Sequence, residues 1–380
     1  MQRSLLLAGL LAISFSCTTE KSTEEIIETS MTYSFLVGTY TEDSTQGINQ
    51  LDFTPSEEKL EIRTIFPGIK SPSFVLANSA GDKVFTLEEI DNVPGGNIIS
   101  LSRNSDKPSL TKISELPSFG DHPCYLALSP DEKFLTAANY SGGNFSAYKI
   151  DEKGNLTHLQ TIQHEGSSVN KGRQSAPHVH STVFSPDGKY LLVADLGTDE
   201  VYVYDFDANS PEPLTLNNAY KTTPGDGPRH LVFSQDGKEI MLVQEMTAAL
   251  EILSFDEGKI TPKQRISLIA DDYKGAIGAA EVRLSPDGKN IYVSNRGDAS
   301  SLSVFAKKDD GKYWLIQQTT SGGIMPRNFN LTADGKYLLS AHQASDDIVV
   351  FERDLDTGKL TQTDWKVSVH RPVYLFRLGD

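Results

Sequence analysis

Short apolar segments separated by tight turns recur along most of the chain. In GPRHLVFSQDGKEIMLVQE, residues 227–245, two apolar segments flank an Asp-Gly pair. An Asp-Gly pair between two such segments is the expected signal of an antiparallel hairpin. No stretch keeps the 3.6-residue apolar period of an amphipathic helix, so helices should be few. The pattern therefore predicts an all-β chain.

The hairpin signal repeats six times at nearly constant spacing. Its copies begin at Ser79, Ser129, Ser185, Ser234, Ser285 and Thr332, which are 50, 56, 49, 51 and 47 residues apart. Each unit reads as strand, turn and strand, and in most units a third strand follows, as in DEVYVYDF and SLSVFAK. Periods of this length built from short strands are typical of β-propeller blades.

The two ends of the chain supply the parts of one more blade. Residues 370–378, HRPVYLFRL, resemble a first strand with nothing after it, and residues 33–53 resemble a second and a third strand without a first. Pairing them completes a seventh blade and leaves no open edge. We predict a seven-bladed β-propeller over residues 33–380, closed by pairing of the C-terminal strand with N-terminal strands.

The N-terminus has the pattern of an export signal. Arg3 is followed by the apolar run LLLAGLLAIS, which is too short to span a bilayer stably, and then by Ser16 and Cys17. Residues 1–16 resemble a bacterial lipoprotein signal peptide, which implies a lipid on Cys17; an ordinary secretory signal is the alternative. Residues 17–32 are predicted to form an acidic tether. We expect an exported lipoprotein in the periplasm or outer membrane, held to the membrane by this anchor only.

Charge and cysteine content limit the molecules that the protein can bind and the disulfides that it can form. The formal net charge of −16 disfavours nucleic acid, whose binders need a basic surface. The chain has two cysteines, so lipidation of Cys17 leaves Cys124 alone and without an intramolecular disulfide. We expect a monomer that binds a small molecule.

Charged residues gather where the predicted hairpins begin and end. These two positions share one edge of each blade, and the edges of all blades surround one mouth of the central channel. Six of the eight histidines fall there. The strand starts hold His122, His178, His180, Arg229, His230, Arg327, His370 and Arg371, and the strand ends hold Glu88, Glu89, Asn139, Asp195, Glu245, Asn295, Arg296 and His342. A ring with several arginines and histidines favours binding of an anion.

Simpler structural roles remain open for several of these residues. Arg229 and Glu245 should be neighbours, either in a site or as an ion pair that stabilises one blade. Asp195 either binds substrate or accepts hydrogen bonds from the turn beside Gly197. His178 and His180 face the same way on a regular strand, which permits a metal site. No clear third ligand follows from the sequence, so we expect no metal and no other cofactor.

The most specific segments are RQSAPHVHSTVFSPDGKYLLVADLGTD, GDGPRHLVF, AAEVRLSPDGKNIYVSNRG and PRNFNLTADGKYLLSAHQ. With them the chain, from about Tyr33 to its end, resembles the seven-bladed propeller lactonases, whose best-known activity is 6-phosphogluconolactonase. The resemblance implies a catalytic set of one histidine, two arginines and a glutamate. By motif these are His178 or His180, Arg229, Arg296 and Glu245.

Three further residues are substrate-binding candidates by position. The unit containing SSVNKGRQSAPH is lengthened, and this segment could fold over the mouth and bring Arg173 to the substrate. Asp195 and Arg327 complete this group.

The residue types suit the opening of a lactone. A glutamate or histidine can act as base or acid, and arginines can hold an anionic substrate and stabilise the developing oxyanion. No G-x-S-x-G nucleophile motif is present. We therefore predict a hydrolase of a sugar-derived or other anionic lactone. The alternatives are a non-catalytic binding propeller of the cell envelope and a cycloisomerase that forms a lactone from an unsaturated diacid.

Overall fold

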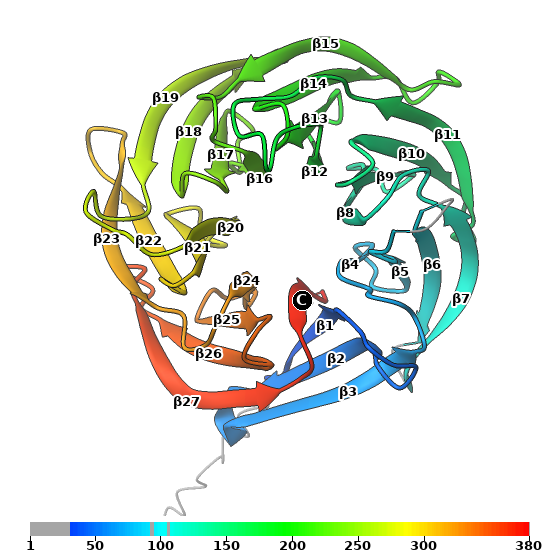
Figure 1. Ribbon diagram of the computed structural model, residues 1–380. Coiled ribbons are helices and arrows are strands. Elements are labelled where there is room, and N and C mark those ends of the chain that lie inside the picture. The colour runs from blue at the N-terminus through cyan, green and yellow to red at the C-terminus, as the bar shows by residue number, and fades with distance from the viewer. Residues whose placement is uncertain (1–30, 92–94, 105–106, 380) are drawn as a thin grey trace, which may run out of the picture.

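The computed structural model describes residues 31–91, 95–104 and 107–379. Seven four-stranded antiparallel sheets form a ring around a central axis (Figure 1). Within the described residues, the one helical element is a 3-10 turn, η1 (Pro55–Glu57). The predicted seven-bladed β-propeller is confirmed. The predicted signal peptide, Cys17 and nearly all of the predicted tether lie outside the described residues.

Each blade has its strands in order from the axis outward. The innermost strands are β28 (Pro372–Arg377), β4 (Val75–Ala77), β8 (Pro123–Leu128), β12 (Val179–Phe184), β16 (Pro228–Phe233), β20 (Ile277–Leu284) and β24 (Pro326–Leu331). The second strands are β1 (Tyr33–Thr39), β5 (Lys83–Leu87), β9 (Phe134–Asn139), β13 (Tyr190–Asp195), β17 (Glu239–Gln244), β21 (Asn290–Gly297) and β25 (Tyr337–His342). The third strands are β2 (Gly47–Thr54), β6 (Asn97–Asn104), β10 (Asn144–Ile150), β14 (Glu200–Phe206), β18 (Ala249–Asp256), β22 (Ser301–Lys307) and β26 (Asp347–Arg353). The outermost strands are β3 (Lys59–Pro67), β7 (Lys107–Pro117), β11 (Leu156–Gln163), β15 (Leu214–Lys221), β19 (Lys259–Ser267), β23 (Tyr313–Thr320) and β27 (Leu360–Ser368).

The chain ends close the ring as predicted. Strand β28 pairs antiparallel with β1, with Leu36 opposite Phe376 and Val37 opposite Leu375. Leu36, Val37 and Leu375 are fully buried. The C-terminal strand thus lies nearest the axis of the blade that the N-terminal strands begin (Figure 1).

The fourth strand of every blade was not predicted from the sequence. These outermost strands carry few apolar residues; in β7, KPSLTKISELP, only Leu110 is buried. Such a strand has solvent at its free edge, so its pairing needs no regular apolar pattern. The hydropathy pattern alone therefore does not reveal the outermost strand.

Neighbouring blades pack their apolar faces against each other. One such core joins Phe35 and Leu51 of the closing blade to Leu339 and Val350 of the preceding blade, all four fully buried. This packing fixes where the innermost strands stand around the axis. Within the described part of the chain, no helix is long and apolar enough to cross a membrane.

Candidate active site at the channel mouth

Six innermost strands change register near their first residues. In β16, Pro228 pairs with Gln244 and Leu231 with Leu242, so the bulge between them contains Arg229 and His230. The same interruption contains Cys124 in β8, His180 in β12, Ala280 and Glu281 in β20, Arg327 in β24, and Val373 in β28. A β-bulge redirects the side chains at the extra residues. Cys124, His180, Arg229, His230 and Arg327 line one small cavity, which marks the channel mouth.

The Glu245 carboxylate is the centre of the mouth and is held by three arginines. Arg229 Nε lies 3.0 Å and Arg296 Nη2 2.8 Å from Glu245 Oε2. Arg173 Nη2 lies 2.7 Å from Oε1 and 3.2 Å from the Tyr140 hydroxyl. The structure thus confirms that Arg229 and Glu245 are neighbours, and it brings Arg296 and Arg173 to them from two other blades.

The charges around Glu245 keep it ionised. Burial opposes its ionisation, but the guanidinium groups of Arg296, Arg229 and Arg173 outweigh burial and hold its pKa well below the ordinary value. Burial and the charges of Arg296 and Arg327 lower the pKa of Arg229. A carboxylate with so low a pKa is a weak general base. Its geometry suits it better to orient the arginines.

His178 and His180 occupy different environments although both rings contact Tyr140. The His178 ring stacks on Tyr140 at 4.6 Å between centroids, and its Nδ1 lies 3.0 Å from the Tyr140 carbonyl oxygen. A carbonyl only accepts, so Nδ1 carries the proton and Nε2 is left as an acceptor. Nε2 makes no hydrogen bond with the described residues.

His180 lies deeper, between Cys124 and His230. Its Nδ1 is 3.9 Å from Cys124 Sγ, and its ring meets the His230 ring edge-on at 5.2 Å. Burial, with the charge of Arg229 and the neighbouring His230, lowers the pKa of His180 well below its ordinary value. His180 is therefore neutral at pH 7, and His178 is the histidine better placed for proton transfer.

The structure does not bring the Asp195 carboxylate into this cluster. Asp195 is fully buried; its Oδ1 accepts hydrogen bonds from the backbone N–H groups of His178 and Gly197 at 2.7 and 2.9 Å. Its Oδ2 lies 2.7 Å from Nδ1 of His164. Asp195 thus holds the turn and the backbone of His178. His164 follows β11, one of the outermost strands that the sequence pattern missed, so this pairing could not be expected.

Arg327 lies in the cavity wall as predicted from its position. Its Nη2 is 4.0 Å from Glu89 Oε1, and its guanidinium lies 5.6 Å above the centre of the Tyr40 ring. Tyr40 donates a hydrogen bond of 2.9 Å to Glu89, and Ser73 donates another. Glu89 belongs to the strand-end positions, whereas Tyr40 was not singled out.

Glu281 and His230 extend the polar network toward the channel interior. His230 Nδ1 lies 3.3 Å from Glu281 Oε2, and Asn328 donates a hydrogen bond to the same oxygen. Burial and the Arg229 charge lower the pKa of His230 to about 4 despite Glu281. Sequence reasoning missed Glu281. Superposing AAEVRL on GPRHLVF would have revealed it, since both segments place bulged residues at equivalent positions.

The mouth carries a surplus of positive charge. Arg173, Arg229, Arg296 and Arg327 face three carboxylates, those of Glu245, Glu89 and Glu281, while His180 and His230 are neutral. In a protein of net charge −16 this surplus attracts a small anion. Among the described residues, no group of three or more His, Cys, Asp or Glu side chains is placed to hold a metal ion.

A seven-bladed propeller with an arginine-rich polar cavity at one channel mouth defines the class of protein. Residues 34–376 match the model of the family described as "Lactonase, 7-bladed beta-propeller". The chain belongs to this family.

Relatives and solved structures agree with this assignment. The chain is 34% identical over 329 residues to an uncharacterised protein of Lactococcus lactis, covering 86% of this chain and 94% of that protein. It is 30% identical over 343 residues to a 6-phosphogluconolactonase of Formosa agariphila, covering 88% and 96%. The solved structure of a periplasmic gluconolactonase of Pseudomonas aeruginosa superposes with a TM-score of 0.86 at 31% identity, covering 92% of this chain and 99% of that one.

Proposed function

We propose that this protein hydrolyses an anionic lactone at the channel mouth. The observation that carries the proposal is the Glu245 carboxylate, which gathers Arg229, Arg296 and Arg173 at distances of 2.7–3.0 Å. Membership of the lactonase family supports the reaction class.

His178 and the arginines have different roles in the proposed reaction. Nε2 of His178, left as an acceptor by the hydrogen bond of Nδ1, takes a proton from the attacking water. The oxygen of the lactone carbonyl gains negative charge in the tetrahedral intermediate, and the buried guanidinium groups stabilise it. Protonated His178 then returns the proton to the departing alkoxide, so the products are a hydroxyl group and a carboxylic acid, which loses its proton to solvent.

Arg173 and Arg327 are the residues we assign to the substrate's anionic group. A guanidinium binds a carboxylate or phosphate through two parallel hydrogen bonds. Arg173 has a half-exposed side chain, 48% accessible, whereas the Arg229 side chain is 2% accessible. Arg173 is therefore free to exchange Glu245 for a substrate anion at little cost.

The N-terminal signal pattern bears on the substrate. We propose that the protein is an exported lipoprotein, anchored through Cys17 in the periplasm or outer membrane. Sugar phosphates are chiefly cytosolic, so export favours a non-phosphorylated sugar lactone whose anionic group is a carboxylate. The similarity to a periplasmic gluconolactonase supports a sugar lactone without phosphate.

A panel of lactones tests the proposal. Purified protein is assayed with glucono-1,5-lactone, which is neutral, with its 6-phosphate and with a sugar lactone that carries a carboxylate, and Arg296→Gln is the matched inactive variant. We expect turnover of a sugar lactone that the variant lacks. Turnover of an unsaturated diacid instead would identify a cycloisomerase, and binding of sugar acids without any turnover would identify a binding protein.

A further inference from the structure

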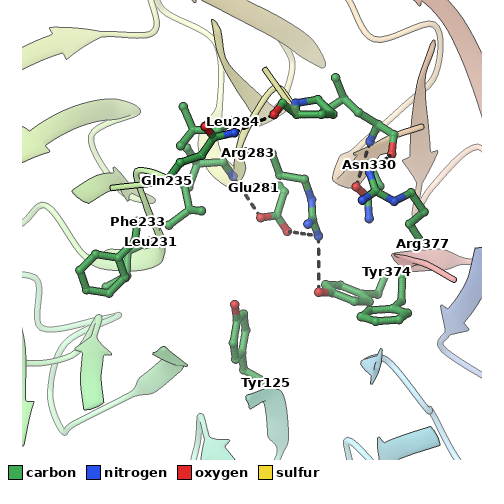
Figure 2. A pocket seen from close by; sticks show the side chains of 15 residues that line it. Tyr125, Leu231, Phe233, Gln235, Glu281, Arg283, Leu284, Asn330, Tyr374 and Arg377 are labelled. Atoms are coloured by element: carbon green, nitrogen blue, oxygen red, sulfur yellow. Dashed lines mark hydrogen bonds and ion pairs between the residues drawn. The ribbon is translucent and has the colours of Figure 1, made fainter. Parts of the chain in front are cut away.

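A second, larger cavity occupies the channel at the end opposite the mouth. It has a volume of about 460 Å³ and is lined by Gln235 and Pro286, which belong to the turns after the innermost strands β16 and β20. The mouth lies at the other end of these strands. Figure 2 shows the side chains of this cavity, which the lactone site leaves unused.

The spare hydrogen-bonding groups of this cavity are donors. The Tyr125 hydroxyl points into the cavity toward Glu281 and Arg283 and makes no hydrogen bond with the described residues (Figure 2). Arg283 donates from Nε to the Phe329 carbonyl at 2.8 Å, and its Nη2 lies 3.4 Å from the Tyr374 hydroxyl. Its Nη1 makes no hydrogen bond within the described part of the chain.

The side-chain acceptors of Glu281 and Asn330 in this cavity are already engaged. Glu281 accepts hydrogen bonds from Asn328 and from the backbone N–H of Val282. Asn330 donates to the Leu375 carbonyl and accepts from the backbone N–H of Leu331. A ligand rich in hydroxyl donors, such as a sugar acid, would find few partners here. A ligand that accepts hydrogen bonds would find two, with the charge of Arg283 beside them.

The remaining walls are apolar and largely aromatic. Phe233, Phe376, Leu231, Leu284 and Leu331 line the cavity together with the rings of Tyr125 and Tyr374. A volume of this size holds a small organic molecule. We propose that this cavity binds a small carboxylate with an aromatic or alicyclic body, its carboxylate hydrogen-bonded by the Tyr125 hydroxyl and the Arg283 guanidinium.

The proposed site is distinct from the lactone site. The two cavities share Tyr374 as a lining residue, and Glu281, His230 and Asn328 lie between them. The carboxylate of Glu281 faces Arg283 from one side and His230 from the other. Apart from Tyr374 the two cavities are lined by different residues, so variants of one lining test binding at that end of the channel.

Calorimetric titration of the purified full-length protein with phenylacetate tests the proposal. We expect one binding site, and we expect that saturating gluconate does not displace the ligand. Tyr125→Phe removes only the unpartnered hydroxyl, so affinity should fall about ten- to a hundredfold, the usual effect of losing a hydrogen bond to a charged group. Leu284→Trp should block binding by filling the cavity.

Two controls make the result decisive. Tyr337→Phe removes a tyrosine hydroxyl that lies outside the cavity, so its affinity should equal that of the parent. Melting temperatures show whether each variant is folded, and Leu284→Trp replaces Tyr125→Phe if the latter is not. Absence of phenylacetate binding, equal loss in Tyr337→Phe, or loss of binding in the mouth variant Arg296→Gln would each overturn the proposal. None of these readouts depends on lactone turnover.

Discussion

Arg173 spans from the loop between β11 and β12 to Glu245 of another blade, with its Nη2 2.7 Å from Glu245 Oε1. The opposite carboxylate oxygen is bound by two buried arginines, Arg229 and Arg296. One oxygen of Glu245 is thus engaged by fixed partners and the other by a partner that is half exposed.

This asymmetry predicts that Arg173 acts in substrate binding rather than in stability. The Arg173 side chain is half exposed, and Glu245 keeps Arg229 and Arg296 as partners without it, so Arg173→Ala should lower the melting temperature only slightly. Loss of a charged contact to a substrate anion should raise KM about tenfold or more. Steady-state kinetics with an anionic lactone measure this, and Lys171→Ala in the same loop is the control. An unchanged KM would remove Arg173 from the site.

The buried arginines are predicted to act on the rate. Removing one donor to a developing oxyanion typically lowers kcat about 10²- to 10³-fold, which we expect for Arg229→Ala and Arg296→Ala. If Arg229 and Glu245 form only a structural pair, the melting temperature should fall while kcat per folded molecule stays near that of the parent. Measuring both quantities on the same samples separates the two roles.

Glu245 should make stability depend on acid pH. Its pKa is lowered in the folded state from the ordinary 4.5. The stabilisation is therefore fully present above about pH 5 and is lost progressively as pH falls from there toward the folded pKa.

Glu245→Gln should remove this dependence. At pH 7 the free energy of unfolding of the variant should be about 3 kcal/mol lower than that of the parent, because three guanidinium groups lose their buried counter-charge. Urea unfolding at pH 7, 5 and 3 measures the difference, which should shrink with acidification. A constant difference would show that Glu245 does not titrate as the geometry requires.

Substitutions of His178 and His180 should have different effects on kcat and on the melting temperature. His178→Gln should lower kcat about 10²-fold or more, because it removes the acceptor that takes the proton from water, while stability changes little. His180→Gln removes a buried ring that packs against Tyr140 and His230, so we expect it to lower the melting temperature more. The reverse outcome would assign proton transfer to His180.

The lipid anchor is tested by Cys17→Ser in the full chain. Export through a lipoprotein signal predicts that the parent is labelled by a fatty-acid probe and sediments with membranes. The variant should lose the label and enter the soluble fraction. A variant that keeps both properties would rule out lipidation at Cys17.

Repeat number, ring closure and the contact of Arg229 with Glu245 were predictable because they depend on local patterns. Asp-Gly turns between apolar segments determine hairpins, and the hairpin register places the start of one strand beside the end of the next. That is sufficient to bring Arg229 next to Glu245. The outermost strands were not predictable, since their side chains face solvent and follow no strict alternation.

By itself, then, the sequence determined a seven-bladed ring with an arginine-rich mouth. Only the tertiary structure decided which mouth residues meet. The β-bulges break the two-residue alternation at His180, Arg229 and Glu281, so side-chain direction there could not follow from spacing. The fold also directed Asp195 to His164 instead of the cavity, and assembled Arg173, Arg229 and Arg296 from three blades around one carboxylate. Such contacts depend on how the blades pack around the axis, and this packing cannot be predicted from local sequence patterns.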